Sequence, residues 1–165
     1  MKIIDNFLPK KEFKEISETL MSNDFPYFFN SSIADSSEEK RSDMFYFIHN
    51  LYMNNTPKSD WYYLINKYIL SKLTIFSLLR MKVNCYPRTE KRIVHGRHVD
   101  FFNHKGSVNG LIFSLNTCNG ATILEDGKEV KSIANRALFF DSMKPHSSTS
   151  CSDKKARFNI NINYL

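Results

Sequence analysis

Two histidines and one aspartate are the residues best suited to chemistry in this sequence. His98 and Asp100 are separated only by Val99, and His146 follows much later in the chain. In a β-strand, side chains at positions i and i+2 project from the same face, so His98 and Asp100 can bind one ion while Val99 points away. Two histidines and a carboxylate are the ligand set of a mononuclear non-haem Fe(II) site with open coordination positions. The sequence therefore predicts a metal site at these three residues, with His146 on a distant strand that closes a sheet around the ion.

Arg157 follows His146 at a distance that places it on the next predicted strand. From there to Tyr164, polar and apolar side chains alternate. The apolar face must be buried against other elements, so the polar face, which carries Arg157, is predicted to line the cavity around the metal. A planar guanidinium binds a carboxylate through two parallel hydrogen bonds. We therefore expect Arg157 to hold a carboxylate there.

The first half of the chain shows helical periodicity in two places. Pro9, at a first helical position, introduces residues 10–21, which repeat apolar residues at helical spacing. Ser59 or Asp60 can cap a second helix that runs to about Lys72. Between them, residues 31–43 are polar and loop-like, and residues 44–53 form an apolar segment without a clear period. Structure is therefore left open for residues 22–58.

From Met81 onward the period changes to two, which predicts short strands over residues 82–86, 110–116, 121–125, 128–133, 136–140 and 157–164. Asp126-Gly127 predicts a two-residue hairpin turn, and Asn135 can adopt the left-handed conformation of another turn. Helices followed by many short strands predict a mainly β fold with N-terminal helices, a double-stranded β-helix (jelly-roll) barrel. We expect one domain over residues 1–165, with 1–80 as helical support and 81–165 as the barrel core.

Composition narrows the class of protein. The chain has 165 residues, 42% of them hydrophobic, which is enough for one globular domain with a core. The sequence has no run of 18 apolar residues, so no membrane association is expected. Its start does not resemble a signal peptide, and its three cysteines have no CxxC spacing, so we expect a reducing cytoplasm and neither a disulfide framework nor a zinc knuckle. The net charge of +6 is dispersed, except in the basic segment 88–97 that directly precedes the metal ligands.

The order of motifs in the second half points to a family. The series comprises Asn84-Cys85-Tyr86, His98-Val99-Asp100, Leu115-Asn116, Gly120-Ala121-Thr122, Phe139-Phe140-Asp141, Pro145-His146-Ser147 and Arg157-Phe158-Asn159. It resembles the Fe(II)/2-oxoglutarate-dependent dioxygenases, particularly the prolyl 4-hydroxylase-like branch and the small single-domain members carried by phages. The resemblance covers residues 81–165 closely and includes the opening residues 3–9.

The resemblance implies three cofactors or cosubstrates: Fe(II), 2-oxoglutarate and O2. His98, Asp100 and His146 would be the metal ligands, and Arg157 would hold the C5 carboxylate of 2-oxoglutarate. Tyr86 resembles a tyrosine that hydrogen-bonds the cosubstrate, and Asn159 stands where family members often have a hydroxyl residue. The implied reaction is oxidative decarboxylation of 2-oxoglutarate coupled to hydroxylation of a substrate. A phage-encoded member would act in the host cytoplasm.

Other histidines compete for the ligand roles. His95 has Arg97 rather than a carboxylate two residues later, and His104 lies in a segment that looks like loop surface. His49 is expected outside the barrel. Tyr86 is also compatible with a purely structural position in the core.

The substrate and the oligomeric state do not follow from the sequence. Hydroxylation of a protein or peptide side chain, such as proline, is the leading hypothesis. The basic charge favours a nucleic-acid oxidative demethylase, but such enzymes resemble a pattern with a second arginine six positions after the first, where this chain has Asn163. A non-catalytic, cupin-like metal-binding module is a third hypothesis, and it would not need Arg157 on the cavity face.

Overall fold

Antiparallel β-sheet dominates the computed structural model, which describes residues 1–33, 44–102 and 105–165. The main sheet has the order β1 (Lys2–Ile4), β9 (Arg136–Asp141), β6 (Asn109–Ser114), β11 (Ala156–Tyr164), β5 (Leu78–Pro87), β3 (Tyr46–Met53) and β2 (Phe28–Asn30), and the short β4 (Thr56–Pro57) pairs with β3. A smaller sheet has the order β10 (Ser147–Ser148), β7 (Ala121–Ile123) and β8 (Glu129–Lys131). The predicted jelly-roll class is confirmed, although the two sheets of the described chain do not join into a closed cylinder.

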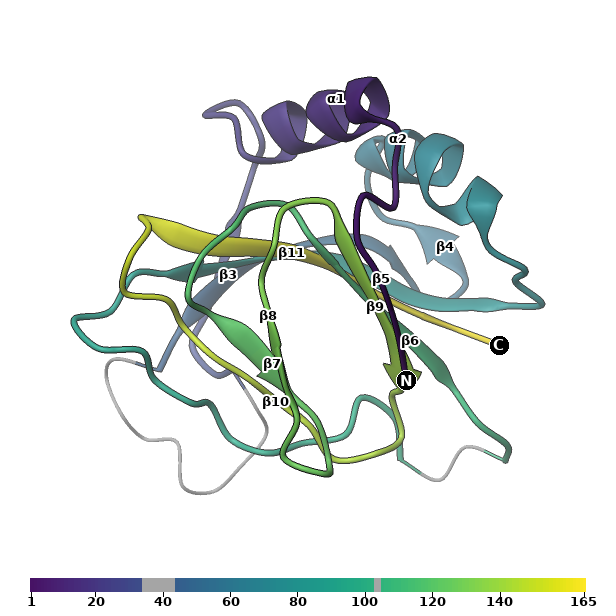
Figure 1. Cartoon of the computed structure of the whole chain (residues 1–165). Coiled ribbons are helices and arrows are strands. Elements are labelled where there is room, and N and C mark those ends of the chain that lie inside the picture. Colours follow the sequence, from purple (N-terminus) through teal and green to yellow (C-terminus); the bar gives the residue numbers. More distant parts are fainter. Residues whose placement is uncertain (34–43, 103–104) are drawn as a thin grey trace.

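Helices occur only in the first half of the described chain, as predicted. Helix α1 spans Lys10–Leu20, and α2 spans Trp61–Tyr68 and is followed by a 3₁₀ turn at Leu70–Lys72. Both helices lie over the same face of the main sheet, and β7, β8 and β10 lie on its other side (Figure 1). Pro9 takes the N-cap position rather than the first helical position, because its backbone is extended and its carbonyl accepts the first helical hydrogen bond, from Phe13 N.

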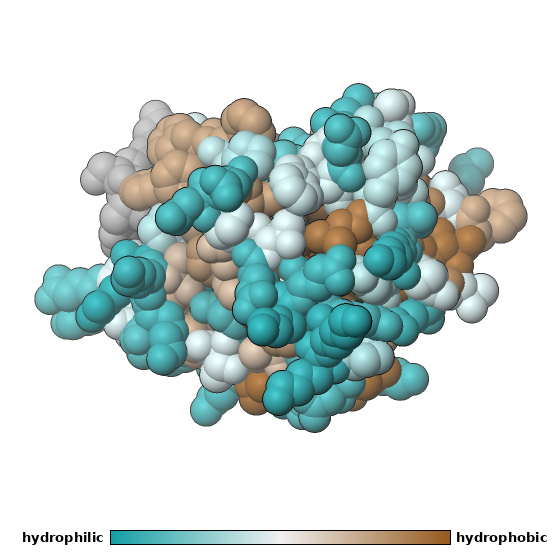
Figure 2. Space-filling model, turned by 90° about the horizontal axis from the view of Figure 1, so that it is seen from above, coloured by the Kyte–Doolittle hydropathy of each residue, from teal (hydrophilic) through white to brown (hydrophobic). Residues whose placement is uncertain are grey.

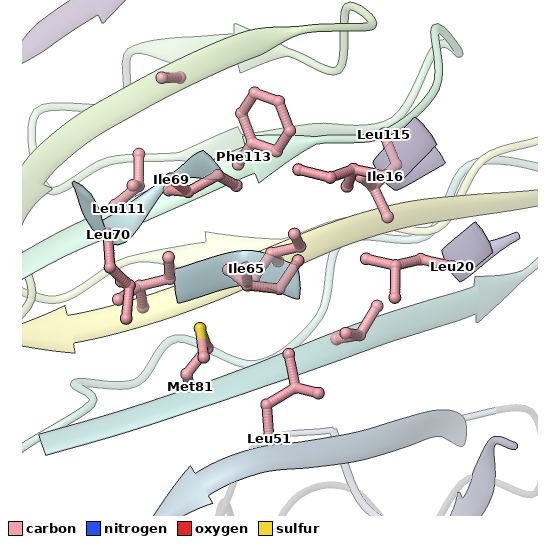
Figure 3. Close-up of a cluster of buried hydrophobic side chains, with 14 of the residues drawn as sticks. Ile16, Leu20, Leu51, Ile65, Ile69, Leu70, Met81, Leu111, Phe113 and Leu115 are labelled. Carbon is pink, nitrogen blue, oxygen red and sulfur yellow. The ribbon is translucent and has the colours of Figure 1, made fainter. Parts of the chain in front are cut away.

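The main core lies between the helices and the main sheet. Ile16 and Leu20 of α1 and Ile65 of α2 are fully buried against side chains of the sheet such as Met81 and Phe113 (Figure 3). A second, smaller cluster of Ile112, Val130, Leu138 and Phe140 fills part of the space between the two sheets. Burial of apolar side chains on both faces fixes the main sheet between two layers.

Strand β11 shows the predicted alternation. Ile160, Ile162 and Tyr164 belong to the helix-side core, whereas Arg157 and its polar neighbours project to the opposite face, into the space between the sheets. Strand β5 pairs antiparallel with β11, and side chains that are paired across the two strands project to the same face of the sheet. Four cross-strand pairs therefore face this space. These pairs are Arg157 with Tyr86, Asn159 with Asn84, Asn161 with Lys82 and Asn163 with Arg80.

The N-terminal half contributes more than helices. The apolar segment that sequence periodicity left open is β3, which pairs with β5 and carries β2 at the sheet edge. Its alternation is obscured because both faces are partly covered and the register shifts between Asn50 and Tyr52. His49 therefore lies within the main sheet rather than outside it. Its Nδ1 is 2.6 Å from Pro26 O and its ring contacts Phe25, on the side away from the space between the sheets.

Two turns contain residues in the left-handed conformation. The hairpin between β7 and β8 is present, but its loop has three residues, with Gly127 in the left-handed region (φ 80°) after a turn over Glu125 and Asp126. This loop differs from the predicted two-residue turn, because glycine takes the left-handed position alone. Asn135 adopts φ 63°, as predicted, and its side-chain amide also exchanges two hydrogen bonds with the backbone of Leu8.

Figure 2 views the molecule from the helical side, where hydrophilic residues cover most of the surface. Among the described residues, no helix combines the length and the apolar character that a membrane crossing would need.

Candidate metal centre

The three predicted ligands come together between the sheets. One ligand atom each from His98, Asp100 and His146 lies within 4.8 Å of the others. The two histidines form an isolated β-bridge in which each backbone N–H donates to the other's carbonyl at 2.9 Å. Asp100 is held by its own N–H, which donates to Ser142 O at 3.0 Å. The segment is therefore extended but not a regular strand, which corrects the expected setting while keeping the expected cluster.

Both imidazoles present the same nitrogen to the cluster. His98 Nδ1 lies 3.2 Å from Gly96 O, and His146 Nδ1 lies 3.0 Å from Lys144 O. A histidine that donates Nδ1–H to a carbonyl keeps the lone pair of Nε2 free for a metal. Burial lowers the pKa of His146 although Asp100 raises it, so the ring is neutral near pH 7. This donor set fits a divalent ion that accepts nitrogen and oxygen ligands.

Asp100 is held from both sides by residues of the two central strands. Arg80 Nη2 donates to Asp100 Oδ1 at 2.6 Å, and Asn163 Nδ2 donates to Asp100 Oδ2 at 2.9 Å. A longer contact of 3.4 Å comes from Asn161 Nδ2. Burial raises the pKa of the carboxyl group, but the charges of Arg80 and Lys82 and the hydrogen bond from Asn163 lower it more, so the pKa is held well below its usual range. The carboxylate is thus ionised and oriented, as a metal ligand must be.

Arg157 lies in the same cavity, with only 1% of its surface exposed. Nη1 donates to Ala121 O at 2.7 Å and to Thr149 O at 3.1 Å, and Nη2 donates to Thr122 Oγ1 at 2.9 Å. Nε is buried with no partner among the described residues. Since a guanidinium has five N–H groups, the Nε–H and one Nη2–H are left to bind something else. Nε and Nη2 lie on one edge of the guanidinium, and this is an edge that a bidentate carboxylate can contact.

Gly120 makes room for this arginine. A Cβ at that position would lie 2.7 Å from Arg157 Cδ and 2.9 Å from Ser150 O, closer than real contacts allow. A glycine is therefore needed at position 120 so that Arg157 can pack against the backbone there. The next two residues of the motif, Ala121 and Thr122, supply hydrogen-bond acceptors for the guanidinium.

Tyr86 and Asn159, the two further cosubstrate candidates, also line the cavity. The Tyr86 ring stacks on Tyr46 and His95, and its centre lies 5.6 Å from the Arg157 guanidinium. Asn159 Oδ1 accepts a hydrogen bond of 2.8 Å from Asn84 Nδ2. Both residues thus have structural partners, and both remain within reach of a molecule bound at Arg157.

The cavity has a narrow inner part and a wider mouth. The inner part, between Arg157 and the two histidines, measures about 30 Å³, which is room for about one water molecule. A pocket of about 580 Å³ opens beside the inner part, and both are lined by Ile33, Lys82 and His98. A bound molecule with several carbon atoms therefore needs more room than the inner part offers by itself.

Of the competing histidines, His95 does not join the cluster. His95 Nδ1 lies 2.8 Å from Ser148 Oγ, and burial together with Arg157 and His98 lowers the pKa of its ring to about 3. His104 lies outside the described residues.

Sequence reasoning did not find Arg80 or Asn163 as partners of the metal ligand. The signal was present, since Arg80, Lys82, Asn84 and Tyr86 continue one period-two face of β5, but only the register of β5 against β11 brings Arg80 to Asp100.

The fold also brings two cysteines together behind Arg157. Cys118 and Cys151 form a cluster with Asp153, and burial raises the pKa of the Cys151 thiol to about 11. Asp153 Oδ1 already accepts a hydrogen bond from Asn119 N at 3.0 Å. Protonated thiols are poor metal ligands, so the histidine cluster is the better candidate.

Comparison with known proteins gives similarity at the level of the fold. No family model matches the chain, and no curated protein matches it in sequence. Among solved structures, a prolyl hydroxylase from Trichoplax adhaerens, in complex with a peptide fragment of the hypoxia inducible factor oxygen degradation domain, aligns over 99% of this chain and 82% of its own, with a TM-score of 0.68 and 21% identity.

Two further structures show the range of chemistry on this fold. The viral collagen prolyl hydroxylase of Paramecium Bursaria Chlorella virus-1, in its 2OG complex, aligns over 99% of this chain and 96% of its own, with a TM-score of 0.62 and 14% identity. The epimerase SnoN, in complex with Fe3+, alpha ketoglutarate and nogalamycin RO, aligns over 99% and 77%, with a TM-score of 0.66 and 12% identity. The chain therefore has the fold of prolyl hydroxylases and other 2-oxoglutarate- and iron-dependent oxygenases.

Proposed function

We propose that this protein is an Fe(II)- and 2-oxoglutarate-dependent dioxygenase. The observation that carries the proposal is the unpartnered Nε–H of Arg157, a buried guanidinium in the same cavity as His98 and His146, the two histidines that cluster with Asp100. A buried cation with unpartnered N–H groups is costly unless it binds an anion. A ligand that chelates the metal at one end and has a carboxylate at the other end would be held by the metal and by Arg157 together.

Each residue has a role in this proposal. His98, Asp100 and His146 hold Fe(II) on one side, while Arg80 and Asn163 keep the Asp100 carboxylate ionised and oriented. Arg157 binds the C5 carboxylate of 2-oxoglutarate, and Tyr86 and Asn159 border that molecule. The bound iron supplies activation of O2, and the walls of the cavity exclude water from the reaction.

We infer that the substrate is a protein or peptide side chain, such as proline. Two similar structures are prolyl hydroxylases by name, and one of them is in complex with a peptide fragment. Proline is the finer part of the proposal, because SnoN, with the same fold, is named an epimerase and is in complex with nogalamycin RO. We also propose, from the sequence resemblance alone, that the protein is similar to phage-carried members and acts in the cytoplasm.

Two alternatives predict different results. A nucleic-acid oxidative demethylase is favoured by the net charge of +6, and it would be stimulated by oligonucleotides. A cupin-like module would bind a metal at the same three residues but would not turn over 2-oxoglutarate.

The test is formation of succinate from 2-oxoglutarate by the purified protein with Fe(II) and O2, alone and with proline-containing peptides, free amino acids or oligonucleotides. Succinate that depends on Fe(II) and is absent in Asp100→Asn supports the proposal. Metal binding without succinate under every condition would leave the cupin-like module as the better account, and stimulation by oligonucleotides alone would favour the demethylase.

A further inference from the structure

Lys82 occupies a special place between the two parts of the cavity. It lies on the cavity face of β5, between Arg80 and Asn84, and it lines both the inner cavity and the wider pocket. Its ammonium group lies 3.4 Å from the hydroxyl of Tyr46. No carboxylate of the described residues lies within ion-pair distance of it. The lysine therefore places a positive charge beside the metal cluster, and within the described part of the chain no carboxylate forms an ion pair with it.

The wider pocket is basic as a whole. Its described lining contains Arg80, Lys82 and Arg97, and Asp100 is the only acidic residue there. Asp100 is already paired with Arg80, and Arg97 donates to a backbone carbonyl, Glu125 O. The remaining lining includes apolar residues: Ile33, Val99, Phe102 and Pro145. This combination suits a molecule with one anionic group and an apolar part.

The half-buried position of Lys82 has an energetic cost. Burial, the main cause, and the charge of Arg80 lower the pKa of Lys82 to about 8, against the smaller opposing effect of Asp100. A nearby anion in the same buried surroundings would stabilise the charged form of the lysine. A methionine or leucine at this position would fill the same space without the cost, so the lysine needs a reason outside the stability of the fold.

We propose that the substrate of this enzyme carries a carboxylate that pairs with Lys82 at the mouth of the metal site. This inference rests on the proposed function and adds the chemical class of the substrate to it. The carboxylate can belong to an acidic residue next to the target side chain in a peptide or to a free amino acid.

The position of Lys82 separates this role from binding of the cosubstrate. Arg157 pairs in register with Tyr86, whereas Lys82 is four residues away along β5, a distance of about 13 Å between backbone positions. Arg157 thus marks the inner end of the cavity and Lys82 its mouth. A nucleic-acid backbone is less suited to this site, because phosphates are usually held by rows of exposed cations rather than by one recessed ammonium group.

The experiment uses Mn(II) in the metal site as a magnetic probe, with 2-oxoglutarate bound. Mn(II) accelerates nuclear relaxation of molecules that bind close to it. The probes are the α-amide of N-acetyl-L-glutamate, which carries one carboxylate, and its neutral counterpart, the α-amide of N-acetyl-L-glutamine. They are followed by a short peptide, capped at both ends, with glutamate beside proline, and by its glutamine version. The variants are Lys82→Met, Lys82→Arg and the exposed control Lys128→Met.

We expect saturable relaxation of the acidic probes in the presence of 2-oxoglutarate, with at least about tenfold weaker binding of the neutral probes. Lys82→Met should abolish this preference, while Lys82→Arg and Lys128→Met should retain it. Tighter binding of the peptide than of the single amino acid would identify an acidic peptide as the source, and the reverse order would identify a free amino acid.

Three results would overturn the inference. These are equal binding of acidic and neutral probes, an acidic preference that survives in Lys82→Met, and displacement of the probes by 2-oxoglutarate, which would assign Lys82 to the cosubstrate. Lys82-dependent binding of an oligothymidylate without binding of the carboxylates would also overturn it. Succinate formation by the same samples without any probe tests the proposed function separately, so failure of one is not confused with failure of the other.

Discussion

Arg80 and Asp100 form a 2.6 Å ion pair between β5 and the extended segment that carries two of the metal ligands. The same guanidinium donates through Nε to Asn163 Oδ1 at 3.1 Å, and Asn163 in turn donates to the other oxygen of Asp100. Arg80 and Asn163 are also register partners across β5 and β11. A metal ligand is therefore oriented by a closed set of hydrogen bonds from the two central strands.

The first prediction concerns Asn163 as a positioning residue. Asn163→Ala removes the hydrogen bond to Asp100 Oδ2 and one acceptor of Arg80, without changing any charge. Loss of such an outer partner typically lowers metal affinity by about 10- to 100-fold. Titration with Mn(II), followed by electron paramagnetic resonance, measures the change. Asn159→Ala, which removes a neighbouring side chain that does not contact Asp100, is the control, and an equal loss in both variants would argue against orientation of Asp100 by Asn163.

The second prediction concerns the metal ligand itself. Asp100→Asn keeps the shape of the side chain but removes the charge, so Mn(II) binding should be lost while the far-UV circular dichroism spectrum is unchanged. Asp126→Asn, in the exposed hairpin, should bind the metal normally. Retained stoichiometric binding in Asp100→Asn would mean that other residues hold the ion.

The third prediction concerns the packing of Arg157. In Gly120→Ala the new methyl group would be 2.7 Å from Arg157 Cδ and 2.9 Å from a backbone oxygen, so the guanidinium must shift. The half-saturating concentration of 2-oxoglutarate should rise by about tenfold or more. Mn(II) affinity of the same variant is the internal control and should change little, because Gly120 does not contact the ligands. Unchanged 2-oxoglutarate binding would show that the position of Arg157 is not critical.

The fourth prediction separates the helical support from the site. Ile65 of α2 is fully buried in the core between the helices and the main sheet. Ile65→Ala should lower the free energy of unfolding by about 2–5 kcal/mol, as measured by urea denaturation. Tyr63→Ala, on the exposed side of the same helix, should change it by about 0.5 kcal/mol or less. Mn(II) affinity under native conditions should be the same in both variants, and a selective loss of metal affinity in Ile65→Ala would contradict the supporting role of α2.

The elements that could be predicted from sequence are those in which polar and apolar residues repeat with a clear helical or strand period. Strand β11 alternates cleanly because one face packs on the helices and the other lines the cavity, and α1 has one apolar stripe. Strand β3 could not be recognised in the same way, since both of its faces are partly covered and its register shifts. The hairpin was predictable from Asp126-Gly127, but the loop length depends on which residue takes the left-handed conformation.

The same distinction holds for the site. His98, Asp100 and His146 could be predicted as a group because the order of motifs over the whole second half of the chain, and not the His-x-Asp spacing alone, resembles one family. The role of Arg80 could not, because its contact with Asp100 depends on the register of β5 against β11 and on the path of the segment before Asp100. The role of Lys82 could not be predicted either, because the sequence shows it only as one polar position of an alternating strand, and the pockets that it lines are formed by distant parts of the chain.

The most direct test of the central claim is anaerobic titration of the Fe(II)-loaded protein with 2-oxoglutarate, observed by the visible charge-transfer band of the chelated complex. The account predicts a band that saturates at one 2-oxoglutarate per chain. In Arg157→Lys the half-saturating concentration should rise, and in Arg157→Ala it should rise by about a hundredfold or more, equivalent to about 2.8 kcal/mol. Fe(II) affinity should be unaltered in both variants, because Arg157 is not a ligand. No band in the wild-type protein, or the same half-saturation in Arg157→Ala, would contradict the account.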